Sequence, residues 1–154
     1  MKIYLDTCCY NRPFDDQEQD RVHSESEAVL SIIRRCREEG HILVGSFILK
    51  IEIDQMPNQA RKSNVLVLYS AVNEEVTYNF DIGNRAMALR ALGTVKDMDS
   101  LHLASAEYAG DDIFLTTDIR LIKACRILPL RTRVLNPVSY LAELIEEDDT
   151  EGDI

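Results

Sequence analysis

The sequence predicts an α/β fold with a mostly parallel central sheet of five strands. Five short apolar runs, rich in β-branched and aromatic residues, have the length and composition of buried strands; they span residues 2–5, 42–47, 76–80, 113–116 and 133–135. Segments with helical spacing or helix-ending residues separate these runs. Because strands alternate with helices along the chain, neighbouring strands are expected to run parallel.

Helical spacing of apolar residues and helix-ending glycine or proline residues predict the helices. They span residues 24–39, a segment around Glu52 that Pro57 interrupts, 60–72, 81–92, 99–109, 119–127 and a last helix from Pro137 onwards. Gly40, Gly93 and Gly110 follow three of these helices and are expected to end them. Residues 65–68 would also suit a strand, and residues 11–16 are expected to form a loop.

The chain has the length of one domain. Its 154 residues, of which 45% are hydrophobic, can bury a single core. We expect a domain over residues 1–145 and an acidic, disordered tail over 146–154. No run approaches the roughly 18 to 20 apolar residues of a membrane-spanning helix, and the N-terminus does not resemble a secretory signal. We therefore expect a soluble, cytoplasmic protein with no membrane partner.

The net charge of −10 argues, at first sight, against a nucleic-acid partner. The last nine residues contribute six acids and no base, however, so the charge of the remaining chain is only −4. A mildly acidic body still lacks a broad surface for phosphates. A metal ion would therefore have to supply much of the positive charge at an RNA-binding site.

Four acidic residues stand at the ends of predicted elements. Asp6 and Asp118 follow the first and fourth strands, Glu52 lies just past the second, and Asp99 opens a helix. Functional sites of parallel sheets collect outside the carboxyl ends of the strands. Carboxylates gathered there repel one another, and a hard divalent cation relieves that repulsion. The pattern predicts a Mg²⁺ or Mn²⁺ site.

Each of these residues also has a purely structural interpretation. Asp6 could begin a turn, Asp99 could cap its helix, and Glu52 could be an exposed helical glutamate. Asp118 could likewise cap the next helix, with Thr117 as a rival cap. The joint placement of the four carboxylates favours the metal site over the separate structural roles.

Two segments resemble the PIN-domain family. IYLDTCCYNRPFDD is similar to the first strand and loop of that family, and KDMDSLHLASAEYAGDDIFLTTD to its second half, where an aspartate opens a D-x-L-H-L-A helix and a later strand ends in T-T-D. The resemblance covers about residues 1–144. It implies a three-layer, flavodoxin-like α/β/α sandwich and a metal-dependent ribonuclease. Some members resemble toxins of the VapC type, which pair with small antitoxins.

Carried over by position, the resemblance assigns the four acidic ligands and catalytic residues to Asp6, Glu52, Asp99 and Asp118. Glu52 lies in FILKIEIDQMPN, which is the least patterned of these segments. Thr117 matches a hydroxyl residue that precedes the last aspartate, and Thr7 and Asn11 resemble supporting positions near the pocket. Asp97 is an alternative to Asp99, although the D-x-L-H-L-A spacing selects Asp99.

Other polar residues have weaker signals. His102 lies three residues after Asp99 and is interpreted as a packed or hydrogen-bonded histidine under the site rather than a ligand. Arg12, Arg120 and Lys123 are candidates for contacts with an RNA backbone, and the basic residues after Asp118 would equally suit a solvated helix face.

The sequence therefore predicts an endoribonuclease that hydrolyses RNA phosphodiester bonds with Mg²⁺ or Mn²⁺. The alternative is an inactive PIN-fold module that binds RNA or a protein. A metal-dependent phosphatase or phospho-accepting domain is a third hypothesis, for which the required aspartate and lysine cannot be placed. The candidate partners are RNA, a small antitoxin and a second copy that packs through the N-terminal helices.

Overall fold

The structure is a computed structural model that describes residues 1–152. Its central sheet has five strands, which are β1 (Lys2–Leu5), β2 (Ile42–Ser46), β3 (Glu74–Val76), β4 (Ile113–Leu115) and β5 (Arg133–Leu135). The strand order is β3-β2-β1-β4-β5, and every neighbouring pair is parallel. The predicted α/β architecture is confirmed, and the sheet is parallel throughout rather than mostly so.

The order along the sheet reverses direction beside β1. The chain moves from β1 to β2 and β3 on one side, and then returns to β4 and β5 on the other. In doubly wound sheets such a switch point opens a crevice outside the carboxyl ends of the strands. Asp6 and Thr116 directly follow the two strands that meet there. The strand order 3-2-1-4-5 differs from the 2-1-3-4-5 order of flavodoxin itself, while the layers are alike.

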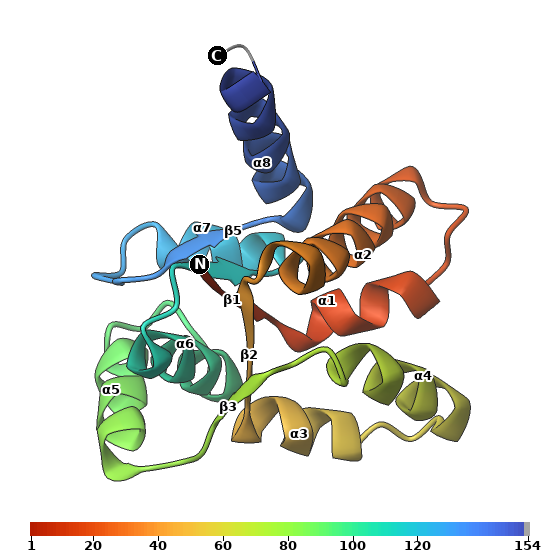
Figure 1. The fold of residues 1–154 in the computed structure, drawn as a ribbon. Helices are drawn as coiled ribbons and strands as arrows, with labels where there is room; N and C mark the ends of the chain where they lie inside the picture. Colours follow the sequence, from red (N-terminus) through yellow and green to blue (C-terminus); the bar gives the residue numbers. More distant parts are fainter. Residues whose placement is uncertain (153–154) are drawn as a thin grey trace.

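Helices cover both faces of the sheet (Figure 1). They are α1 (Thr7–Asn11), the 3₁₀ helix η1 (Arg12–Phe14), α2 (Asp20–Glu39), α3 (Phe47–Asp54), α4 (Gln59–Tyr69), α5 (Phe80–Ala91), α6 (Asp97–Ala109), α7 (Ile119–Cys125) and α8 (Pro137–Gly152). In Figure 1, α5 and α6 pack together on one side, whereas α1 and α2 lie on the other. The α/β/α layers expected from the resemblance are therefore present.

The prediction of a strand over residues 76–80 is wrong. The strand is Glu74–Val76, and Phe80 already belongs to α5. The physical reason is Asn79, whose side chain accepts a hydrogen bond from the backbone N–H of Ile82 and so caps the helix. Within the predicted loop over 11–16, Asn11 ends α1 and η1 follows it.

Two further boundaries differ from expectation. Helix α6 begins at Asp97, so Asp99 lies in its first turn and is not the cap. The acidic segment expected to be disordered continues α8 as far as Gly152, and residues 153 and 154 lie outside the described residues. An ion pair of 2.9 Å between Arg35 and Asp148 ties this part of α8 to α2.

The core is centred on β1. Ile3, Tyr4 and Leu5 are buried, and the ring of Tyr4 stacks on Phe114 of β4 at a centroid distance of 5.1 Å. Glycines with positive φ follow α2 and α6, as the sequence predicted. The four cysteines are free, and all but Cys8 are buried. In the part of the chain that the structure describes, no helix is long and apolar enough to cross a lipid bilayer.

A carboxylate is buried at the edge of the sheet opposite to the acidic residues. Asp111 precedes β4 and is only 4% exposed, and neither of its oxygens has a hydrogen-bond partner among the described residues. Burial raises the pKa of this carboxyl to about 8; the Lys2 amine lowers it, and Glu74 and Asp112 raise it further. Ionised Asp111 is therefore a source of instability.

We predict that Asp111→Asn stabilises the protein at alkaline pH. Since the folded-state pKa lies above the usual 3.8, the favourable contribution of protonated Asp111 is lost as pH rises from about 4 through about 8. The variant, measured by urea unfolding, should gain about 1 kcal/mol or more at pH above 8 and show a flatter pH profile. Substitution of the exposed Asp81 by Asn is the control and should keep the wild-type slope. Equal profiles for Asp111→Asn and wild type would contradict the prediction.

Candidate functional site

Asp6 and Thr116 join the ends of β1 and β4. The Asp6 carboxylate accepts a hydrogen bond from the backbone N–H of Thr7 at 2.8 Å and one from the Thr116 hydroxyl at 2.8 Å. The Thr116 hydroxyl oxygen in turn accepts from the N–H of Asp118 at 3.1 Å. The neighbouring strands thus bring Asp6 and Thr116 together, whereas the sequence led us to expect Asp6 and Asp118 to converge there. Thr116, which contacts Asp6, was not among the predicted site residues.

Asp118 caps α7. Its carboxylate accepts hydrogen bonds from the N–H groups of Arg120 at 3.0 Å and Leu121 at 3.3 Å. The interpretation of Asp118 as a helix cap is therefore confirmed, and Thr117 is not the cap. Only the Oδ1 atom makes these bonds and the residue is exposed, so the Oδ2 atom is available to a further ligand.

Asp99 faces the other acids, whereas Asp97 does not. Asp97 makes a surface ion pair with Arg90 at 2.5 Å. Asp99 is half-buried, and no hydrogen bond engages its carboxylate within residues 1–152. Burial is the main cause that raises its pKa to about 6, and the charge of Asp6 is the next. His102 lowers the pKa of Asp99, whereas Asp118 and Glu52 make smaller contributions that raise it.

Glu52 is the sixth residue of α3 and points towards Asp6 and α6. Its Oε1 atom contacts Nε2 of His102 and accepts a hydrogen bond from the Thr7 hydroxyl at 3.2 Å. The interpretation of Glu52 as an exposed helical glutamate is therefore wrong. We call the four residues Asp6, Glu52, Asp99 and Asp118 the acidic cluster. The first two and the last each raise the pKa of Asp99.

A buried hydrogen-bonded chain supports the acidic cluster from below. The Tyr4 hydroxyl lies 2.6 Å from Nδ1 of His102 and 2.6 Å from the hydroxyl of Ser46, which caps α3. His102 therefore lies between Tyr4 and Glu52, in agreement with its interpretation as a hydrogen-bonded histidine under the site. Tyr4 and Ser46 were not predicted; the only signal was a polar side chain inside or at the end of an apolar strand.

His102 offsets part of the negative charge. Its burial alone lowers the pKa of the imidazole, but the hydrogen bond with Glu52 and the charges of Asp6 and Asp99 outweigh that effect and raise it. The second contact with Asp6 is 3.7 Å long. The histidine consequently keeps its proton to higher pH than usual, and a cation then stands among three carboxylates.

The three supporting residues have different surroundings. Thr7 contacts Glu52 as described. Asn11 instead accepts a hydrogen bond from Arg61 at 3.2 Å and donates to the carbonyl of Thr7, so its side chain holds the loop together. Thr117 is buried, and its backbone N–H donates to the thiol of Cys8 at 3.3 Å. Thr7 alone among these three makes a side-chain hydrogen bond to the acidic cluster in the described structure.

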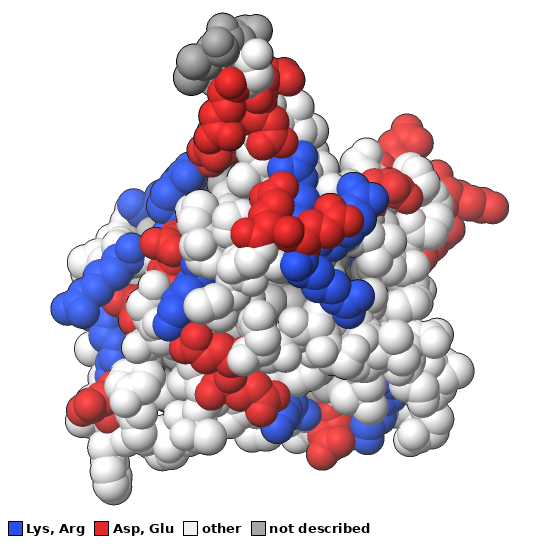
Figure 2. Space-filling view, in the orientation of Figure 1, with Lys and Arg blue, Asp and Glu red and all other residues white. Residues whose placement is uncertain are grey.

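The basic side chains that are candidates for RNA contacts differ in their ion pairs and exposure. Arg12 makes ion pairs with buried Glu25 at 2.8 Å and with Asp15 at 3.2 Å, so it is held within the protein. Arg120 and Lys123 of α7 are exposed and have no carboxylate within ion-pair distance in residues 1–152. Figure 2 shows basic and acidic side chains interspersed on the face in view, without one broad basic surface.

The carboxylate oxygens of the acidic cluster are of the kind that a hard divalent cation prefers. Among the described residues, however, no group of three His, Cys, Asp or Glu side chains converges as a metal site. Glu52 contacts His102, and Asp118 caps α7. Mg²⁺ commonly binds through one or two carboxylates and keeps several waters, so Asp6 and partner-free Asp99 fit such an ion.

The mutual influence of the acids predicts a shift in the pKa of Asp99. The Asp6→Asn substitution removes a negative charge that raises this pKa and should therefore lower it from about 6 towards its usual range. Carbon NMR of the Asp99 carboxyl during a pH titration measures the shift. Asp97→Asn, two residues away and paired with Arg90, should leave the pKa unchanged. A pKa that does not respond to Asp6→Asn would show that the two carboxylates are not neighbours.

The buried chain under the cluster predicts a stability effect. Tyr4→Phe removes the hydroxyl that joins Ser46 and His102, and it leaves both polar groups buried without that partner. The free energy of unfolding should fall by about 1–3 kcal/mol, as measured by urea denaturation. Tyr78→Phe, at an exposed tyrosine, should change it by less than about 0.5 kcal/mol. Equal stability of Tyr4→Phe and wild type would contradict a structural role for this chain.

Comparisons with known proteins are informative at the level of structure. No family model matches the sequence, and no curated protein matches it. The structure of VapBC2 from Rickettsia felis bound to a DNA fragment from their promoter matches with a TM-score of 0.59 at 12% identity, over 88% of this chain and 98% of that chain. FitAcB from Neisseria gonorrhoeae matches with a TM-score of 0.56 at 18% identity, over 88% and 97% of the two chains.

VapBC-1 from nontypeable Haemophilus influenzae gives a similar result, with a TM-score of 0.56 at 15% identity over 89% of this chain and 98% of that chain. Identities this low relate the proteins by fold alone. The chain therefore has a PIN-like α/β/α fold, which it shares with chains of VapBC and FitAB structures over almost their whole length.

Proposed function

We propose that this protein is a metal-dependent endoribonuclease of the PIN type, which hydrolyses RNA phosphodiester bonds at the acidic cluster. The observation that carries the proposal is Asp99. It is a half-buried carboxylate without a hydrogen-bond partner in the described chain, and its pKa is raised to about 6 by burial and by the neighbouring acids. Such a group is poised to exchange its proton for a divalent cation, because the cation relieves the same repulsion.

Each acid of the cluster has a distinct task in this proposal. Asp6 is held rigidly by Thr7 and Thr116, and with Asp99 it would bind Mg²⁺ or Mn²⁺. When bound, such an ion lowers the pKa of a water molecule and neutralises charge on the phosphate. Glu52, held by His102 and Thr7, lies beside them as a proton acceptor or further ligand. Asp118 presents its free Oδ2 atom at the rim.

The surrounding charges support a polyanionic substrate. Arg120, Lys123 and Arg126 belong to α7 and its C-terminal cap, directly after Asp118, and no carboxylate pairs with them among the described residues. Lys96, which precedes α6, is likewise without such a pair. These basic side chains would contact phosphates on either side of the cleaved bond. The affinity for RNA would then fall as the salt concentration increases.

A small antitoxin protein is the partner that we propose. The similar solved structures are named as VapBC and FitAB assemblies, and the resemblance of the motifs to VapC-type toxins implies the same kind of pairing. A protein that cleaves RNA in the cell that makes it would need such a partner to restrain it. A homodimer is a second assembly that we propose to test by light scattering.

One observation favours a second candidate function, a PIN-fold module that binds RNA or a protein without cleavage. Glu52 is engaged by His102 and Asp118 by the start of α7, and no three ligand side chains of the described chain converge on one point. A protein that no longer bound metal could retain these contacts as its resting state.

Metal binding and cleavage separate the two candidates. We predict that wild type binds Mn²⁺ in calorimetry and cleaves single-stranded RNA, and that Asp6→Asn and Asp99→Asn each reduce the Mn²⁺ affinity by more than about 100-fold, since outer-shell partners alone account for about 10–100-fold. Asp97→Asn is the matched control, because Asp97 is a neighbouring acid held by Arg90. Circular dichroism should show that all variants remain folded.

The outcomes are distinct. Wild-type cleavage retained by Asp6→Asn and Asp99→Asn would overturn the proposed site. RNA binding without cleavage under any divalent cation would support the non-cleaving module. Loss of activity in Asp97→Asn, equal to that in Asp99→Asn, would show that the ligand had been assigned to the wrong aspartate.

A further inference from the structure

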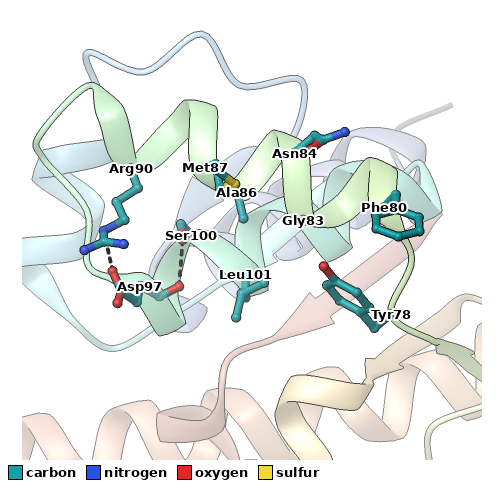
Figure 3. Close-up of a pocket in the computed structure, with 10 residues that line it drawn as sticks. All are labelled: Tyr78, Phe80, Gly83, Asn84, Ala86, Met87, Arg90, Asp97, Ser100 and Leu101. Atoms are coloured by element: carbon teal, nitrogen blue, oxygen red, sulfur yellow. Dashed lines mark hydrogen bonds and ion pairs between the residues drawn. The ribbon is translucent and has the colours of Figure 1, made fainter.

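A groove between α5 and α6 lies outside the acidic cluster. Its volume is about 520 Å³, and its walls include Tyr78, Phe80, Asn84, Met87, Ser100 and Leu101 (Figure 3). Phe80 is 84% exposed and Tyr78 is 56% exposed. Large aromatic side chains with this much exposure, gathered around one concave surface, mark a place where a flat apolar group can bind.

Tyr78 is held in place by its neighbours. A Cβ atom on Gly83 would lie only 2.4 Å from the Tyr78 hydroxyl, so the glycine allows the ring to approach α5 closely. On another side, the ring of Phe47 meets Tyr78 edge to face, with centroids 5.5 Å apart. Figure 3 shows the Tyr78 ring below Gly83, with Phe80 beside it. The tyrosine therefore offers a preformed aromatic surface.

Helix α6 contributes to both the groove and the acidic cluster. Ser100, which lines the groove, directly follows Asp99 in α6, and Tyr78 comes two residues after β3. The strand order places β3 and β2 on one side of β1, and β4 with α7 on the other. The aromatic side chains that follow β3, the acids beside β1 and the exposed basic side chains of α7 after β4 therefore follow the order of the strands. This order would suit an extended RNA chain, which offers nucleobases to the aromatic rings and phosphates to the basic side chains.

The lining favours a nucleobase over an apolar peptide side chain. The Tyr78 hydroxyl and the Asn84 amide have no hydrogen-bond partner in residues 1–152, so both are available to the polar edge of a base. Lys96, which has no carboxylate within ion-pair distance there, flanks the groove next to Asp97 and suits an adjoining phosphate. An apolar partner would leave these polar groups without hydrogen bonds.

We propose that this groove is a nucleobase subsite, in which one unpaired base of an RNA chain stacks on Tyr78 and Phe80. The phosphodiester next to that base lies at the acidic cluster, and the following phosphates reach α7. The inference rests on the proposed function and narrows its substrate class to single-stranded RNA, because a paired base cannot enter the groove.

The test uses a short single-stranded RNA that carries a fluorescent adenine analogue, whose emission is quenched when it stacks. The full-length protein is titrated into it in EDTA, which prevents cleavage. Wild type should quench the analogue at one position of the strand. Tyr78→Leu and Phe80→Leu should abolish this quenching and weaken binding about tenfold. Gly83→Ala, which displaces the Tyr78 hydroxyl, should have an intermediate effect.

The matched control is Tyr108→Leu. Tyr108 is 57% exposed on the same helix α6 but does not line the groove, so its loss should leave both quenching and affinity unchanged. The same RNA annealed to its complement should show no quenching with any variant. Circular dichroism checks the fold of each variant, and light scattering checks its oligomeric state.

Equal quenching and affinity for wild type, Tyr78→Leu and Phe80→Leu would overturn the subsite. So would a change of Phe80→Leu from dimer to monomer without loss of RNA affinity, which would assign the groove to a second copy. A failure of the proposed nuclease function can be distinguished from a failure of the subsite. Quenching in EDTA without cleavage in Mn²⁺ would retain the subsite and reject the nuclease, whereas cleavage with unaffected groove variants would reject the subsite alone.

Discussion

The mutual repulsion of four carboxylates at one edge of a parallel sheet is the constraint on which the rest of the structure depends. Parallel pairing of β1 with β4 places Asp6 beside Thr116, and α3 and α6 bring Glu52 and Asp99 to the same place. Burial, and next to it the charge of Asp6, raise the pKa of Asp99 to about 6. The fold offsets this repulsion with hydrogen-bond donors and with His102, whose pKa is raised by Glu52 and Asp6, and a hard cation would relieve the remainder.

The hydrogen bonds that support the acidic cluster come from buried residues beneath it. Ser46, Tyr4 and His102 form a chain of hydrogen bonds that is closed to solvent and ends on Glu52. Because every polar atom of this chain needs its partner, the floor of the site is rigid. The carboxylates of Asp99 and Asp118 have fewer side-chain partners in the described structure. A rigid floor below less constrained carboxylates would suit the cation site that we propose.

The strand order also explains why three different surfaces adjoin. The reversal beside β1 opens the crevice in which the acids meet, and the connections on its two sides carry opposite chemistry. Tyr78 after β3 and Phe80 at the start of α5 supply exposed aromatic rings, and α7 after β4 supplies basic side chains that have no ion pair within the described residues. With a mildly acidic body and no broad basic surface in view (Figure 2), recognition of RNA would depend on this edge alone. Affinity would then come from stacking and a few phosphate contacts rather than from the overall field.

Local sequence determined the elements that depend on local forces. The apolar run before Asp6, the glycines after α2 and α6, and the alternation of strands with helices predicted a parallel α/β sheet with acids at its carboxyl edge. The exceptions, such as the start of α5 at Phe80, follow from a single capping side chain. Tertiary structure alone decided which hydroxyl reaches Asp6, which of Asp97 and Asp99 turns inward, and that Tyr4 and Ser46 support His102. These choices depend on contacts between residues far apart in the chain, such as Tyr4 and His102, which no spacing within one segment encodes.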